Sequence, residues 1–346
     1  MSSDPAQLKM VKDIGSQDIL MCLTRVPGTE RLIYGSSDFK VYDVDMAVEK
    51  PKAEPLNGEG HGSYVTGITL AGRHIVSGGY DCRLVWWDVS SRTQVRAADA
   101  HEKWIRRVQA SPDGTVVASV GDDCVCKLWD AESGRLLHTL TDHKPITPHN
   151  FPSMLFAIAF SRDGRLMATG DKVGHVAIWE MPSAKKVGEI EAPLMYTWDP
   201  RQRRHSIGGI RSLAFSPDGK HIAVGGTGQI GNVDHLEAPA RLEIFEWATQ
   251  KRTLEMQDAK YKGLIERLEW HPSGAWIAAC GGDHKGFVSF YEPNGKVIRQ
   301  LDAHQHAHDF AFNDDWTKLF TVHHGRLQAW SLKHEPAEAE IPASVG

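Results

Sequence analysis

Short apolar runs alternate with turn residues along almost the whole chain. The runs at residues 105–110, 155–160, 210–215 and 265–270 share one spacing of apolar positions, and residues 65–70 form a copy followed by a shortened turn. Apolar runs of this length, each bounded by turn residues, predict β-strands. The chain therefore contains one type of strand repeated many times.

A turn of four residues follows most of these runs. The copies are Ser111-Pro112-Asp113-Gly114, Ser161-Arg162-Asp163-Gly164, Ser216-Pro217-Asp218-Gly219 and the looser His271-Pro272-Ser273-Gly274. Proline presets φ at the second turn position, while Asp and Gly accept the bend and the positive φ that a hairpin needs. Each tetrad is predicted to connect two antiparallel strands.

A second landmark ends another set of apolar runs. It is an aromatic residue followed by an acid or Ser, at Tyr42-Asp43, Trp87-Asp88, Trp129-Asp130, Trp179-Glu180, Phe245-Glu246, Tyr291-Glu292 and Trp330-Ser331. Successive landmarks are 39 to 66 residues apart. A period in the forties that holds several short strands is typical of a propeller blade. Seven landmarks predict an all-β, seven-bladed propeller with four-stranded antiparallel blades.

The strongest copies of the repeat are residues 77–88 and 119–130. In both, an Asp lies six residues before the final Trp and a Ser lies four residues before that Asp. The sequence resembles the WD-repeat β-propeller family, and the resemblance covers nearly the whole chain. The family also places a His in the loop that leads into each blade, and His61 and His101 match it.

The resemblance implies a buried network in which His contacts Asp on one side and Ser on the other, and Ser contacts the Trp indole. The free-energy cost of burying such polar groups is small only when each has a hydrogen-bond partner. The expected members are His61, Ser77, Asp81 and Trp87 in one blade and His101, Ser119, Asp123 and Trp129 in the next. Val173 and His324 stand where blades four and seven need the Asp. Phe245 and Tyr291 replace the Trp of blades five and six, where the network is absent or rebuilt.

Closing the ring requires a partner for the last blade, because an open sheet edge exposes unpaired backbone groups. Residues 7–14 alternate like an outer strand, and we predict that they form the closing strand of the last blade. Residues 1–332 are then a single propeller domain. Residues 333–346 are rich in Glu, Ala and Pro, a composition that predicts a disordered tail.

Three segments exceed the minimal blade: residues 144–154, 191–209 and 226–240. In the topology that the resemblance implies, all three emerge on one face, called the top. Their aromatic and basic residues are candidates for partner binding, as are three residues that the resemblance places on the same face. The full set is Phe151, Tyr196, Trp198, Arg201, Arg203, Arg204, Tyr80, Trp104 and Asp122. The alternative is that the aromatic side chains pack back onto the ring and the basic side chains are merely solvated. The sequence leaves open whether residues 191–209 are ordered.

Composition narrows the choice of partners. Of 346 residues, 41% are hydrophobic and 24% charged, and the formal net charge of −5 provides no global basic field for nucleic acid. No apolar stretch is long enough to cross a membrane. Five scattered cysteines indicate neither a disulfide framework nor a structural zinc site. We expect a cytoplasmic protein, favoured to be a monomer, with protein partners and no cofactor.

Histidines near the end of the chain invite a metal hypothesis. His304, His306 and His308 alternate, and His324 lies in the next loop. Alternating residues of a strand share one side, as zinc ligands would, but His304 matches the His that leads into a blade, and no acid completes the set. Residues 226–231 fit GxGxxG yet lack the βαβ unit that gives this motif its function, which favours a plain hairpin loop. We predict no metal site.

No sequence signature of catalysis is present: there is no GxSxG, Walker or HExxH motif. We therefore predict a non-enzymatic scaffold or adaptor that binds protein partners on the top face over blades three to five. The alternative is a hydrolase-like enzyme or a metal-dependent binder that uses the top rim or the central channel, because propellers also host enzymes.

Overall fold

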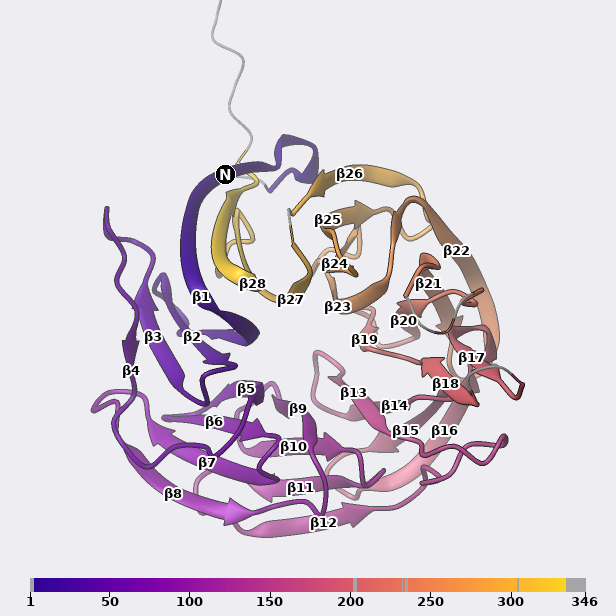
Figure 1. Ribbon diagram of the computed structural model, residues 1–346, viewed down its shortest axis with the longest axis horizontal. Helices are drawn as coiled ribbons and strands as arrows, with labels where there is room; N and C mark the ends of the chain where they lie inside the picture. The colour runs from indigo at the N-terminus through magenta and orange to yellow at the C-terminus, as the bar shows by residue number, and fades with distance from the viewer. Residues whose placement is uncertain (1–2, 202–203, 232, 234–235, 304, 334–346) are drawn as a thin grey trace, which may run out of the picture.

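The computed structural model describes residues 3–201, 204–231, 233, 236–303 and 305–333. These residues form antiparallel β-sheets, with two 3₁₀ turns at Pro5–Gln7 and Pro193–Met195 and no α-helix in the described ranges. Residues 334–346, for which a disordered tail is predicted, lie outside the described part. The sheets stand side by side around a central axis (Figure 1).

Five sheets have four strands each, connected in chain order from the axis outward (Figure 1). They consist of β5 (Val65–Ala71), β6 (His74–Gly79), β7 (Arg83–Asp88) and β8 (Gln94–Asp99); β9 (Ile105–Ala110), β10 (Val116–Gly121), β11 (Cys126–Asp130) and β12 (Leu136–Leu140); β13 (Leu155–Phe160), β14 (Leu166–Asp171), β15 (His175–Glu180) and β16 (Lys185–Glu191); β19 (Ser212–Phe215), β20 (His221–Thr227), β21 (Pro239–Glu246) and β22 (Lys251–Lys262); and β23 (Leu264–Trp270), β24 (Ile277–Gly282), β25 (Gly286–Tyr291) and β26 (Val297–Asp302).

The sixth main sheet corrects the predicted count of seven blades. It has six strands in the order β27-β28-β1-β2-β3-β4, and it contains both the first and the last landmark of the sequence. Its members are β1 (Lys9–Arg25), β2 (Arg31–Ser36), β3 (Val41–Asp45), β4 (Glu54–Pro55), β27 (Ala307–Phe312) and β28 (Lys318–Ser331). The two expected blades are not separate sheets because β1 runs unbroken from the outer edge of one into the inner position of the other (Figure 1).

The junction between the two ends of the chain lies inside this sheet. The first half of β1 pairs with β28, from Lys9 opposite Ser331 to Gly15 opposite Arg326, and the second half pairs with β2. Leu8 and Leu332 are buried in the same apolar cluster beside this pairing. The edge of β28 is therefore covered by backbone partners at the point where the ring closes.

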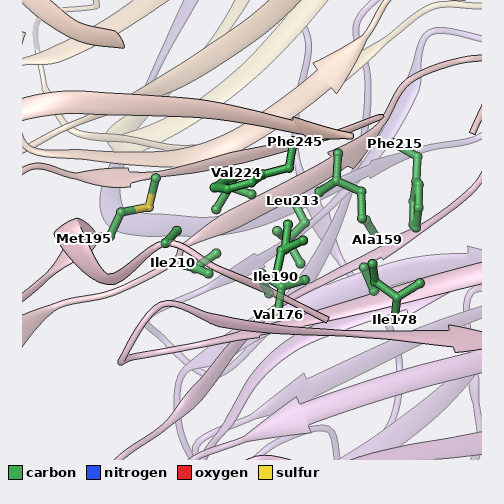
Figure 2. Close-up of a cluster of buried hydrophobic side chains, with 14 residues drawn as sticks. Ala159, Val176, Ile178, Ile190, Met195, Ile210, Leu213, Phe215, Val224 and Phe245 are labelled. Carbon is green, nitrogen blue, oxygen red and sulfur yellow. The ribbon is translucent and has the colours of Figure 1, made fainter. Parts of the chain in front are cut away.

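The apolar core lies between neighbouring sheets rather than within one of them. Figure 2 shows one such layer, where Ile178 and Ile190 from the β13–β16 sheet face Leu213 and Val224 from the β19–β22 sheet. Each of these side chains is at most 2% exposed. Strands with both faces covered by neighbouring sheets, such as β13 and β14, are buried along nearly their whole length, whereas the outer strand β16 alternates between exposed and covered residues.

The tetrads form the tight hairpin turns that their residues predict. Gly114 has φ +70°, Gly164 has φ +71°, Gly219 has φ +69° and Gly274 has φ +76°, the left-handed region that favours glycine. In the first copy the amide of Gly114 donates to the carbonyl of Ser111 at 2.8 Å. Any residue with a Cβ would strain these turns.

Candidate functional site

A hydrogen-bonded network crosses the β5–β8 sheet from a loop to the core. His61 Nδ1 lies 3.0 Å from Asp81 Oδ2, and its Nε2 lies 2.8 Å from Ser77 Oγ, which also accepts the indole N–H of Trp87 at 2.9 Å. The β9–β12 sheet repeats it with His101, Ser119, Asp123 and Trp129 at 2.8 to 2.9 Å. Every polar group in each network has a partner, as burial requires.

These Asp–His–Ser arrangements have the contacts of a hydrolase triad, but their serine hydroxyls are not accessible to a substrate. Ser77 and Ser119 are fully buried at 0% exposure, and each hydroxyl already accepts a bond from a Trp indole. Burial raises the pKa of Asp81, but hydrogen bonds from His61 and the backbone outweigh it and hold the pKa below its ordinary value. A nucleophile needs a path to substrate, so neither serine can act as one.

A third network lies in the β13–β16 sheet, where the sequence pattern predicted none. His143 Nδ1 lies 2.9 Å from Asp171 Oδ2, its Nε2 lies 2.8 Å from Thr169 Oγ1, and Trp179 donates to that hydroxyl at 3.0 Å. The acid is two residues earlier than Val173, at the end of β14 instead of in the following turn. Fixed spacing from Trp179 therefore missed both Asp171 and His143.

The sheets that lack the repeat pattern rebuild the network with other residues. Trp330 donates to Thr321 at 2.9 Å, and Thr321 contacts His323 at 2.7 Å, so His323 contacts the hydroxyl here as His61 does in the β5–β8 sheet. Tyr291, which replaces a Trp, donates its hydroxyl to Asp258 at 2.7 Å.

The three insertions meet one another. The hydroxyl of Tyr196 donates to Thr147 Oγ1 at 3.2 Å, and the amide of Ile230 donates to Thr197 Oγ1 at 2.9 Å. His149 stacks on Trp198 with ring centroids 3.8 Å apart. The second insertion forms a hairpin of β17 (Tyr196–Asp199) and β18 (His205–Gly208), and these contacts hold all three segments together.

Burial divides the predicted partner residues into two groups. Trp104 is 48% exposed and Trp198 40%, and Arg201 and Arg204 are also exposed. Tyr80 and Phe151 are half-buried, and Arg203 lies outside the described residues. Tyr196 and Asp122 are buried at 8% and 9%, and their polar groups bond to Thr147 and Arg106. These two residues support the surface from beneath and are removed from the candidate contact set.

An aromatic row, defined as Phe39, Tyr64, Tyr80 and Trp104, lies beside this surface. Successive ring centroids are 5.8, 5.8 and 4.2 Å apart. Only Tyr80 and Trp104 were predicted. Phe39 and Tyr64 occupy the equivalent connections one repeat earlier, so comparing loops across repeats would have revealed them. Three of the four are at least 40% exposed, which is unusual for residues with no function at a surface.

Three of the histidines near the end of the chain pack together. The rings of His306, His308 and His324 lie 4.5 to 5.8 Å apart. Burial holds the pKa of His308 well below its ordinary value. Within the described ranges, which omit His304, no group of three or more His, Cys, Asp or Glu residues is arranged to hold a metal ion.

A charged cluster lies under the first insertion. His175 contacts Glu191 at 2.6 Å and Asp142 at 2.8 Å, and Lys186 also contacts Asp142 at 2.8 Å. Burial lowers the pKa of His175, but the hydrogen bonds to Glu191 and Asp142 outweigh that effect and raise the pKa to about 9. His175 is therefore protonated in the folded protein at neutral pH.

This raised pKa predicts a pH-dependent stability. The folded pKa exceeds the unfolded value of 6.5, so the stabilisation by His175 is complete below pH 6.5 and is lost as the pH rises towards 9. We expect the difference in unfolding free energy between the wild type and His175→Gln to shrink by about 1 to 2 kcal/mol over that window, less than the full shift because Glu191 is exposed. Urea denaturation at both ends of the window measures it. His138→Gln, an exposed control, should show no such trend; a constant difference for His175→Gln would contradict the assignment.

Comparison with known proteins identifies the repeats. The family model described as "WD domain, G-beta repeat" matches residues 54–88, 92–130 and 200–230. The chain is 26% identical over 213 residues to Eukaryotic translation initiation factor 3 subunit I of Candida albicans, covering 59% of this chain and 53% of that protein. It is 27% identical over 261 residues to Nuclear distribution protein PAC1 of Arthroderma otae, covering 69% of this chain and 51% of that protein.

The chain thus spans about half the length of the curated relatives it matches. No helix in the described ranges has the length and apolar character needed to cross a membrane. The matched segments coincide with the sheets that carry the His–Ser–Trp networks and with the strands that follow the second insertion. The chain therefore carries WD repeats over these three segments, within radial antiparallel sheets like those of the WD-repeat β-propellers that it resembles.

Proposed function

We propose that this protein is a non-enzymatic, cytoplasmic scaffold that binds protein partners on the face carrying the three insertions. The observation that carries the proposal is the exposed Trp198, stacked on His149 and supported by contacts among all three insertions. An exposed indole held rigid on a surface is characteristic of a binding hot spot, since little entropy is lost when a partner covers it.

The basic side chains beside this indole favour a protein partner over an apolar small molecule. Arg201 and Arg204 are exposed at the tip of the β17–β18 hairpin, and Arg and Trp are the residues most enriched at hot spots. One relative is, by its name, a subunit of a larger factor, which is consistent with a role in assembly. The buried serines of the networks weigh against the hydrolase alternative, and the lack of a metal cluster in the described residues weighs against the metal-dependent one.

Affinity capture from the source cell tests the surface. We expect the variant Trp198→Ala/Arg201→Ala/Arg204→Ala to retain less than about one tenth of the partner captured by the wild type, because loss of one hot-spot side chain weakens binding by about 2 kcal/mol or more. The matched control is Val297→Ala/Arg299→Ala, which removes exposed side chains from the outer strand β26. Equal capture by both variants would overturn the proposed surface, and turnover of a hydrolase substrate would overturn the proposed class.

A further inference from the structure

A polar cavity of about 300 Å³ opens at the top end of the central channel. Its walls come from the first residues of the inner strands, including Arg107 of β9, Phe156 of β13 and Glu266 of β23. Tyr80 of the aromatic row and Met154 of the first insertion also line it. The cavity therefore lies between the aromatic row and the insertions.

Three guanidinium groups face this cavity, and they differ in their partners. Arg106 binds Asp122 through two nitrogens at 2.6 and 2.7 Å, and Arg107 lies 3.4 Å from Asp309. Arg211 has no such carboxylate among the described residues. Its Nη1 is buried without a hydrogen-bond partner there, and its Cζ lies 3.6 Å from the centroid of the Phe156 ring.

A fourth cation adds to the positive potential. Lys172 is 7% exposed, and its amine donates to the carbonyl of Pro152 at 3.2 Å. Burial lowers the pKa of Lys172, and the positive charge of Arg211 lowers it further. Burial likewise lowers the pKa of Arg211 to about 10. A buried cation and a half-buried one that repel each other are costly unless an anion joins them.

The acidic group that lines the cavity compensates this positive charge only in part. Glu266, the one carboxylate among the residues that line it, lies 3.3 Å from His306 Nε2. Burial raises the pKa of Glu266, but His306 and Arg211 outweigh this and lower it to about 2. His308 also lines the cavity, and its pKa, well below the ordinary value, makes it neutral at pH 7.

We propose that this cavity binds an oxyanion, a carboxylate or phosphate group held mainly by Arg211 with Arg107 opposite. The planar guanidinium presents paired N–H donors that match two oxygens of such a group, and Arg211 has the free donor that such a bond needs. The inference deepens the proposed function. The oxyanion is either an acidic side chain of the protein partner or a free small anion, and only the first of these rests on the proposed function.

Small anions test the chemistry without knowledge of the partner. The full chain is melted in rising concentrations of phosphate or glutarate, with chloride balancing the ionic strength. We expect the wild-type melting temperature to rise by about 2 °C when the anion concentration is about ten times its Kd. Arg211→Gln should weaken the apparent affinity for phosphate by about tenfold or more, as expected for loss of a charged hydrogen bond. Arg162→Gln, an exposed position near the opposite end of the channel, loses the same charge and should bind like the wild type.

Arg211→Gln should fold, because it removes a repelled cation that no described carboxylate contacts in an ion pair; its melting temperature without added anion reports this. If it does not fold, Arg107→Gln replaces it, with the same expected loss of phosphate affinity. An absent shift in the wild type, or a shift unchanged in these variants, overturns the inference.

Two further outcomes identify whether the oxyanion comes from the partner or from solution. If Arg211→Gln no longer captures the partner, and phosphate competes with the partner for the wild type, the site is supported and its occupant is an acidic side chain of the partner. Capture that persists while phosphate binding is lost supports the site with a free anion. If no partner binds the wild type at all, the proposed scaffold role fails while the anion-dependent shift still decides the cavity.

Discussion

Deletion of residues 1–14 will lower the melting temperature of the whole protein by about 10 °C. The estimate combines the burial of Leu8, about 2 kcal/mol, with about 1 kcal/mol for each backbone hydrogen bond lost between β1 and β28. For a chain of this length each kcal/mol corresponds to about 1.4 °C. Thermal unfolding followed by circular dichroism measures the change.

The expected effect is global because β1 belongs to two parts of the ring at once. Its first half pairs with β28 and its second half with β2, so the deletion removes the link between the two ends of the chain and exposes the edge of β28. Val11 is 53% exposed at a bulge in the same segment, and Val11→Ala should leave the melt within a degree or two. An unchanged melt after the deletion would refute the role of this strand in closing the ring.

Asp171→Ala will lower the free energy of unfolding by about 3 kcal/mol. The carboxylate accepts His143 Nδ1 at 2.9 Å, and its other oxygen accepts the amides of Val173 and His175, both at 3.0 Å. Removing it leaves three donors unsatisfied, two of them on the backbone of the turn that starts β15. Urea denaturation of the two proteins gives the difference.

The matched control uses the position that the repeat pattern assigns to this acid. Val173→Ala should change the stability by less than about 1 kcal/mol, because the Val173 side chain is half-buried and apolar, and the substitution keeps the backbone amide that donates to Asp171. Equal effects of the two substitutions would mean that Asp171 has no special role. A double-mutant cycle with His143→Ala adds a second check, since groups in one network should show a coupling of about 1 kcal/mol or more.

The network residues show how far repeat spacing can predict a site. His61, Ser77 and Asp81 stand at the family's intervals, and their side chains meet at hydrogen-bond distance. Asp171 and His143 meet just as closely, but one lies two residues off the interval and the other precedes an insertion. A hydrogen bond depends on distance in space, so a network survives changes in spacing that hide it from a sequence pattern.

The candidate surface shows the same division between what the sequence predicts and what only the folded structure decides. Trp198 was predicted from the composition of its loop and Trp104 from the family resemblance, and both are exposed. Tyr196 looked equivalent to Trp198, but it precedes it by two residues on one strand of the hairpin and is buried against Thr147. Composition identifies which loops are rich in aromatic residues; only packing decides which of their side chains face outward.

The sequence by itself determined the all-β class, the radial repeat, the hairpin turns and two of the four Trp networks found in the described residues, because each follows from residues a fixed short interval apart. The tertiary structure alone decided that the first and last repeats share one six-stranded sheet, and that Arg211 lines the channel with a buried nitrogen that has no hydrogen-bond partner among the described residues. Both depend on which distant segments come together when the ring closes. No periodic interval along the chain encodes those contacts.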